Sequence, residues 1–141
     1  MDSKGCYFRD EPEAADGSLL LLGVSPDSLF FEFYHTYEGP FGSDFIGYIL
    51  SEVLNGIAPD TNYFRENQGF LFQHLVISDM CAYAVLVYDC ITDRVYNVDF
   101  EGGVERLIAG TLEPQWPSFE AFLDFYFLGV GVDDFLHGKN N

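Results

Sequence analysis

Positively charged residues are scarce in this sequence, which has six Lys and Arg against 23 Asp and Glu among its 141 residues. The formal net charge is −17 at pH 7, and no Lys or Arg lies between Asp10 and Phe64. Because neutralising phosphate groups requires Lys and Arg, this composition argues against direct binding to nucleic acid or to an anionic membrane. It favours either a basic protein partner, attracted over long range, or an acidic surface that serves only solubility.

Cysteine and long apolar runs are also limited. The three cysteines, Cys6, Cys81 and Cys90, cannot all pair with one another, and we expect them to be buried and reduced. The longest apolar run near the N-terminus, Leu19–Leu22, is too short to span a bilayer or to form the core of a signal peptide. We therefore expect a cytoplasmic protein that does not interact with a membrane.

Residues that could carry catalysis or hold a metal are few and scattered. The three histidines are His35, His74 and His137, and no local signature joins one of them to Cys81 or Cys90 as nucleophile and base. The spacing of Cys and His is too wide to indicate zinc. His74 lies in a strand-like run, where a structural role is expected. We therefore expect a protein that is not an enzyme and that holds no metal and no cofactor.

Aromatic residues are abundant at 18%, and we expect most of them in the core and the surplus on the surface. The stretch Phe70–Glu113 organises the fold. Its first two runs are nearly continuous in apolar and β-branched residues, which is typical of strands buried on both faces. The third alternates, and Gly102-Gly103 indicates a hairpin turn to a fourth. The predicted strands of this meander are Leu71–Ile77, Ala82–Tyr88, Val95–Phe100 and Val104–Ala109.

Helices are expected on either side of the meander. The spacing of apolar residues predicts one over Asp27–Glu38, capped by Ser25, and one over Phe119–Leu128, capped by Ser118. Between them, Ser51–Ile57 could form a short helix, and the polar residues Asp60–Gly69 indicate a loop. The predicted fold is a single α+β domain, a twisted antiparallel sheet of about four to six strands with helices packed on one face.

Several short motifs, taken in order, resemble the SUKH superfamily, which joins bacterial immunity proteins, fungal regulators of cell-wall synthesis and some viral proteins. The resemblance covers Gly23–Leu128. It departs from the family at Glu38-Gly39, where Asn-Gly is usual, and at Ser78-Asp79-Met80, where glycine is frequent. The matching motifs are Pro26-Asp27-Ser28-Leu29, Phe33-Tyr34, Glu38-Gly39-Pro40, Ile46-Gly47-Tyr48-Ile49-Leu50, Val87-Tyr88-Asp89, Arg94-Val95-Tyr96-Asn97-Val98-Asp99 and Pro117-Ser118-Phe119-Glu120-Ala121-Phe122-Leu123.

The resemblance divides the chain into a loosely structured acidic lead-in over residues 1–22, one SUKH-like domain over 23–137, and a frayed tail over 138–141. It implies an immunity-type protein that neutralises a cognate toxin, a nuclease or another enzyme that modifies nucleic acid, by protein–protein binding. The alternative within the same superfamily is a non-enzymatic regulator or scaffold, or a viral counter-defence protein. A neighbouring gene for a toxin with a basic domain would favour the first.

Carboxylates in the predicted turns and strand edges are the candidate contacts for a basic partner, because exposed loops carry many binding residues. Those in the cation-free stretch would also produce an uncompensated negative field. The alternative is that they are solvated surface charges. The six candidates are Glu38, Asp44, Glu52, Asp60, Asp79 and Asp93.

Overall fold

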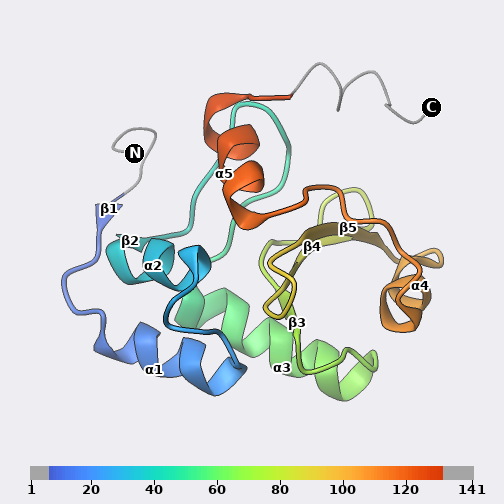
Figure 1. The fold of residues 1–141 in the computed structure, drawn as a ribbon, viewed down its shortest axis with the longest axis horizontal. Coiled ribbons are helices and arrows are strands. Elements are labelled where there is room, and N and C mark those ends of the chain that lie inside the picture. The colour runs from blue at the N-terminus through green and yellow to red at the C-terminus, as the bar shows by residue number, and fades with distance from the viewer. Residues whose placement is uncertain (1–6, 132–141) are drawn as a thin grey trace.

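The computed structural model describes residues 7–131 and confirms an α+β fold in one domain (Figure 1). Three of the predicted strands form an antiparallel sheet in the order β3-β4-β5. In this sheet Leu75 lies opposite Tyr88, and Leu86 lies opposite Asn97. The elements are β1 (Tyr7–Phe8), α1 (Glu13–Leu22), α2 (Leu29–Thr36), β2 (Tyr37–Glu38), the π-helical turn η1 (Val53–Ile57), α3 (Ala58–Asn67), β3 (His74–Val76), β4 (Ala84–Asp89), β5 (Val95–Asp99), α4 (Gly103–Ala109) and α5 (Phe119–Leu128).

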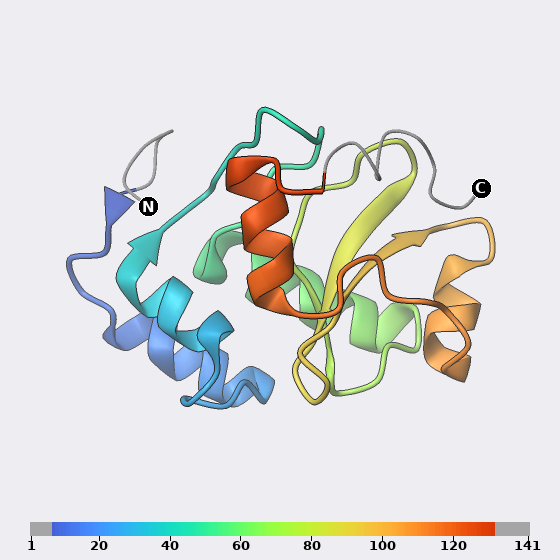
Figure 2. The ribbon, with the colours of Figure 1, turned by 45° about the horizontal axis from the view of Figure 1, so that its top comes forward.

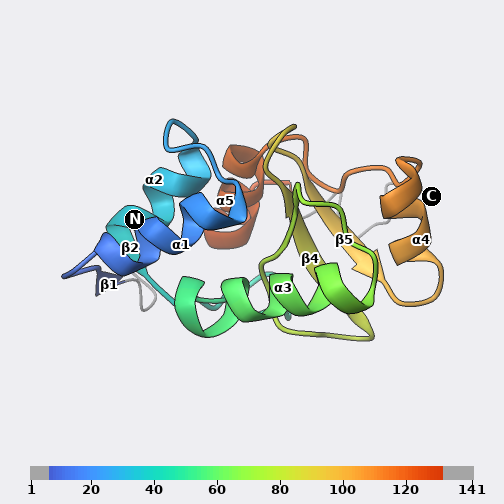
Figure 3. The same cartoon turned by 90° about the horizontal axis from the view of Figure 1, so that it is seen from below.

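The main sheet has fewer strands than expected, and helices cover both of its faces instead of one. Every residue of β4 is buried, and successive side chains point to opposite faces. Leu86 and Tyr88 belong to the larger core, with the buried residues of α1, α2 and α5. Val85 and Val87 belong to a second core with residues of α4 and with Phe64 of α3. Figure 3 shows α3 and α4 beside the sheet from below.

The fourth predicted strand, Val104–Ala109, is wrong, because these residues belong to helix α4. Gly102 has φ of 111°, and the Asp99 carboxylate accepts hydrogen bonds from the N–H groups of Glu101 and Gly103. The two glycines therefore start a helix and do not form a hairpin. Val104 and Leu107 are buried three residues apart, which is helical spacing. Figures 1 and 2 show α4 at the far end of the molecule from β1 and α1.

The loose lead-in expected over residues 1–22 is wrong for the part that the structure describes. Tyr7–Phe8 pairs with β2, and Glu13–Leu22 forms helix α1. Ala15, Leu19 and Leu22 are buried in the larger core at helical spacing. The predicted tail, residues 138–141, and the end of the predicted domain lie outside the described residues.

Three other helical segments differ in how closely they match expectation. Helix α5 has the predicted bounds, and its Ser118 hydroxyl accepts from the N–H of Ala121. Helix α2 is shorter than expected and is capped by Ser28, whose hydroxyl accepts from the N–H of Phe31, in place of Ser25. The loop expected at Asp60–Gly69 is mostly helix α3, which continues directly from η1.

The turn between β3 and β4 has an unfavourable backbone conformation. Cys81 and Ala84 exchange two backbone hydrogen bonds of 2.9 and 3.1 Å. The residues between them, Ala82 and Tyr83, have φ of 53° and 65°. Positive φ at both central residues normally requires Asn or Gly, and each side chain there costs about 1–2 kcal/mol. Tyr83 is nevertheless 60% exposed, so burial of its ring does not offset that cost.

Candidate functional site

The six predicted contact carboxylates do not all line one hollow. Glu38 and Glu52 line the same groove, and none of the other four lines it. Asp44 lines a separate hollow of about 250 Å³ beside α5. Asp60 is exposed in the first turn of α3.

Two of these carboxylates, Asp79 and Asp93, accept hydrogen bonds within the fold. Asp79 is exposed, but its Oδ1 accepts from the N–H of Ile49 at 2.8 Å. Asp93 accepts from the hydroxyl of Tyr88 at 2.8 Å and from the N–H of Phe119 at 3.4 Å. It therefore connects the β4–β5 turn to the start of α5. That Asp79 and Asp93 also contact a partner stays a prediction.

Glu52 is not the exposed contact that its predicted turn suggested, because it is only 9% exposed and is paired with Arg9. Its two oxygens accept from Nη1 and Nη2 of Arg9 at 2.7 and 3.0 Å. The same carboxylate accepts from the N–H of Gly39 at 2.8 Å. Arg9 also donates to the carbonyls of Tyr34 and Tyr37. This ion pair fastens the segment after β1 onto α2, β2 and η1.

A groove of about 470 Å³ lies next to this ion pair, between the segment after β1 and η1. A smaller hollow of about 230 Å³ continues from it, because Glu38, Glu52 and Asn55 line both. We call the larger space the acidic groove. Its walls are Arg9, Asp10, Glu11, Ala14, Glu38, Glu52, Leu54 and Asn55.

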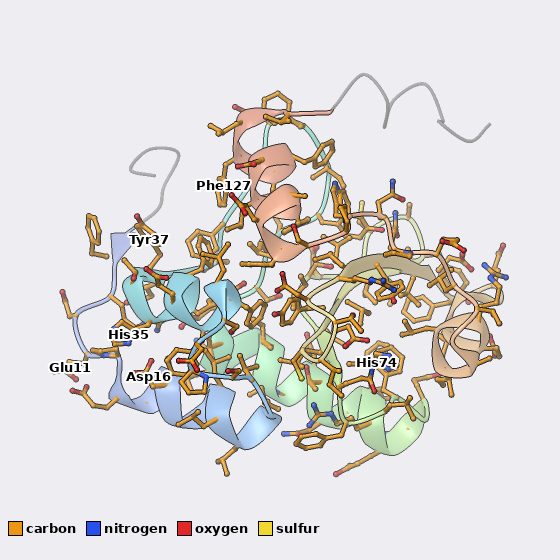
Figure 4. The ribbon with its side chains drawn as sticks, viewed as in Figure 1. Glu11, Asp16, His35, Tyr37, His74 and Phe127 are labelled. Atoms are coloured by element: carbon orange, nitrogen blue, oxygen red, sulfur yellow. The ribbon has the colours of Figure 1, made fainter. Side chains whose placement is uncertain are left out.

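The acidic groove has an uncompensated negative charge. Asp10, Glu11 and Glu38 are exposed, and none of them forms an ion pair with another residue of 7–131. The groove's cation, Arg9, is neutralised by Glu52 within the wall. Figure 4 shows Glu11 at the outer edge of the molecule, where a large partner could approach it.

Apolar side chains are exposed beside these charges. Leu54 lines the acidic groove and is 46% exposed, and Ile49 lines the adjoining hollow and is 43% exposed. A protein interface commonly combines an apolar centre with a polar rim. The arrangement therefore suits a protein surface that presents Lys or Arg around an apolar patch.

The sequence contains one signal for the position of this groove. Asp10 and Glu11 belonged to the predicted loose lead-in, yet Ala15, Leu19 and Leu22 already have the spacing of a helix facing a core. An ordered α1 places the residues before it against η1. No comparable pattern marks Glu52, which follows the polar Ser51 and precedes Val53 and Leu54.

His74 and Asp89 form a buried polar pair on the sheet. His74 Nδ1 accepts from the N–H of Leu71 at 3.3 Å, and its Nε2 lies 3.9 Å from Asp89 Oδ2. The same carboxylate accepts from Gln73, and its other oxygen accepts from the N–H groups that form the β4–β5 turn. Burial lowers the pKa of His74, and the negative charge of Asp89 partly opposes that shift. His74 is thus buried and held by polar contacts, which is the environment expected of a structural histidine.

No group of three His, Cys, Asp or Glu placed to hold a metal ion occurs among residues 7–131. Cys81 and Cys90 are free and half-buried, and Cys6 lies outside the described residues. In the same part of the chain, none of the helices has the length and apolarity that crossing a bilayer requires.

Compared with known proteins, the chain matches no family model, and it has no significant match among curated proteins or solved structures. The SUKH resemblance therefore stays a prediction based on the motifs quoted above.

Proposed function

We propose that this protein is a non-enzymatic binding protein that uses the acidic groove to hold a basic protein surface. The observation that carries the proposal is the set of three carboxylates, Asp10, Glu11 and Glu38, that have no ion-pair partner within residues 7–131 and surround a groove whose arginine is already neutralised. A net charge of −17 adds long-range attraction for such a partner.

The class of partner in this proposal is taken from the resemblance to SUKH proteins. We propose that the partner is a toxin domain acting on nucleic acid, and that binding neutralises it in the cytoplasm. An enzyme that grips phosphate presents Lys and Arg at its active site. A carboxylate-lined surface competes for those same side chains, so binding and inhibition have one physical cause.

The test compares two variants with the same total charge. The groove variant is Asp10→Asn, Glu11→Gln and Glu38→Gln. The control variant is Glu32→Gln, Glu113→Gln and Glu120→Gln, which neutralises three exposed carboxylates that do not line the groove. Each substitution set changes the formal charge from −17 to −14, that is, by three of the 23 carboxylates.

The wild type and both variants are used to capture partners from cells of the source organism. A captured protein is then purified and its association rate is measured at low and high salt. We expect the captured partner to be a basic protein whose association rate falls about tenfold or more between low and high salt. We expect a fall of the same size when the groove variant is compared with the control variant. It should be toxic when expressed alone and harmless when co-expressed with this protein. A partner whose association rate responds equally to both variants, or to neither, would contradict the proposal.

A further inference from the structure

Another hollow, at the other end of α3 from the acidic groove, is lined by aromatic rings. Its volume is about 430 Å³, and we call it the aromatic pocket. Tyr63, Met80 and Tyr83 are 56%, 57% and 60% exposed around it, which is a concentration of large exposed side chains. The lining residues are Tyr63, Phe64, Gln68, Met80, Tyr83, Phe100, Val104 and Glu105.

The rings of the aromatic pocket are inclined to one another. The centroids of Tyr63 and Phe64 are 5.9 Å apart at an interplanar angle of 69°. Phe64 and Phe100 follow at 5.9 Å and 39°, and Phe100 and Tyr83 at 5.6 Å and 78°. The four rings therefore line the hollow at different inclinations, in contact with one another in series.

One residue of this lining, Tyr83, has an unfavourable backbone conformation. Tyr83 lies in the turn whose two central residues have positive φ, although glycine would occupy that position without strain. Its ring contacts Phe100 and is otherwise largely exposed. Strained residues that the core does not require are typical of binding sites.

The electrostatics of the aromatic pocket select the charge of its occupant. Glu105 places a carboxylate in the wall, and no Lys or Arg lines the space. Arg106, the neighbouring residue, is directed to Asp99, with 3.6 Å between Nη2 and Oδ2. The faces of aromatic rings carry partial negative charge and attract cations. An aromatic lining with one carboxylate therefore complements a cation on an apolar stem, which describes Arg and Lys side chains.

We infer that the aromatic pocket binds a single Arg or Lys side chain of the basic partner. The stem would contact Met80 and Phe100, and the charged head would lie between the Tyr83 ring and the Glu105 carboxylate. This inference rests on the proposed function for the source of the side chain. The chemistry of the pocket can be tested with small probes alone.

The test is an NMR titration of the full-length protein with blocked single amino acids. The probes are N-acetyl-arginine methylamide, the lysine equivalent, and the citrulline equivalent, which has the shape of arginine without its charge. We expect saturable shifts of the amide signals of Tyr83, Phe100 and Glu105 with arginine, lysine or both. Citrulline should produce no saturable shifts there, and the stronger cation identifies the preferred side chain.

Two variants and one control establish the residues responsible. Tyr83→Gly removes the ring at a position where glycine fits the backbone, so this variant should fold at least as stably as the wild type. Glu105→Gln removes only the charge. Each should weaken binding of the cationic probe at least tenfold at the pocket, whereas Glu120→Gln, an exposed carboxylate in the first turn of α5, should leave it unchanged.

Equal shifts with citrulline would overturn the inference, because they would show that the pocket does not select charge. So would the absence of saturable shifts at Tyr83, Phe100 and Glu105. Shifts confined to Asp10, Glu11 and Glu38 would overturn it too, while leaving the proposed function intact. The proposed function fails separately, if the groove variant associates with the captured partner as the control variant does.

Discussion

Replacing Glu52 by Gln is the most direct test of how the acidic groove is built. The side chains of Arg9 and Glu52 are only 5% and 10% exposed, and the guanidinium meets both carboxylate oxygens. Glutamine keeps the shape of glutamate but leaves the Arg9 charge buried without a counter-charge. Breaking a buried pair in this way typically costs about 3–5 kcal/mol. Because the Arg9 guanidinium still donates to the carbonyls of Tyr34 and Tyr37, we expect a loss of about 3 kcal/mol.

Urea unfolding of the wild type, Glu52→Gln, Arg9→Met and the double variant measures this loss and the coupling between the two residues. The double variant should be less destabilised than the sum of the single variants, because it leaves no uncompensated charge. Glu38→Gln is the matched control. Glu38 is an exposed carboxylate in the same groove, and its neutralisation should change the free energy of unfolding by about 0.5 kcal/mol or less. Additive losses, or a loss below about 1 kcal/mol for Glu52→Gln, would refute the reasoning.

Two further predictions concern the core and the buried histidine. Phe122 is fully buried, so Phe122→Ala should lower the free energy of unfolding by about 3–5 kcal/mol, and a loss below about 1 kcal/mol in urea unfolding would contradict its core position. Burial lowers the pKa of His74 below its ordinary 6.5, so the unfolded chain binds more protons than the folded protein below that pH, and acid weakens the fold through this residue. His74→Gln should remove that component, which is measured as the difference in unfolding free energy between wild type and variant from about pH 8 to pH 5; a difference that does not change with pH would contradict it.

The central sheet and the last helix could be predicted because their signals are local. From Tyr96 to Asp99, buried and less buried positions alternate along β5. Ser118 followed by apolar residues at helical spacing marks the start of α5. The register and the antiparallel direction then follow from short turns. These features need no knowledge of distant parts of the chain.

The errors arose where a side-chain contact or a strained backbone conformation, which the local sequence pattern does not reveal, determines the outcome. Gly102-Gly103 is compatible with a hairpin until the Asp99 side chain accepts the N–H groups that begin α4. Glu52 resembles an exposed carboxylate until Arg9, which lies 43 residues earlier in the chain, folds onto it. Tyr83 belongs to a predicted strand, and nothing local indicates that its backbone has positive φ.

The continuous η1–α3 segment fixes the distance between the acidic groove and the aromatic pocket. Leu54 and Asn55 line the acidic groove, and Tyr63 and Phe64 line the aromatic pocket, so one unbroken helical rod joins the two (Figure 3). At about 1.5 Å per residue in the α-helix, and less in the π-helical turn, Asn55 and Phe64 are separated by about 13 Å along its axis. A ligand that occupies both sites would bind the second with the high effective concentration of a tethered group. The rod would then act as a molecular ruler that discriminates among basic proteins by the spacing of their charges.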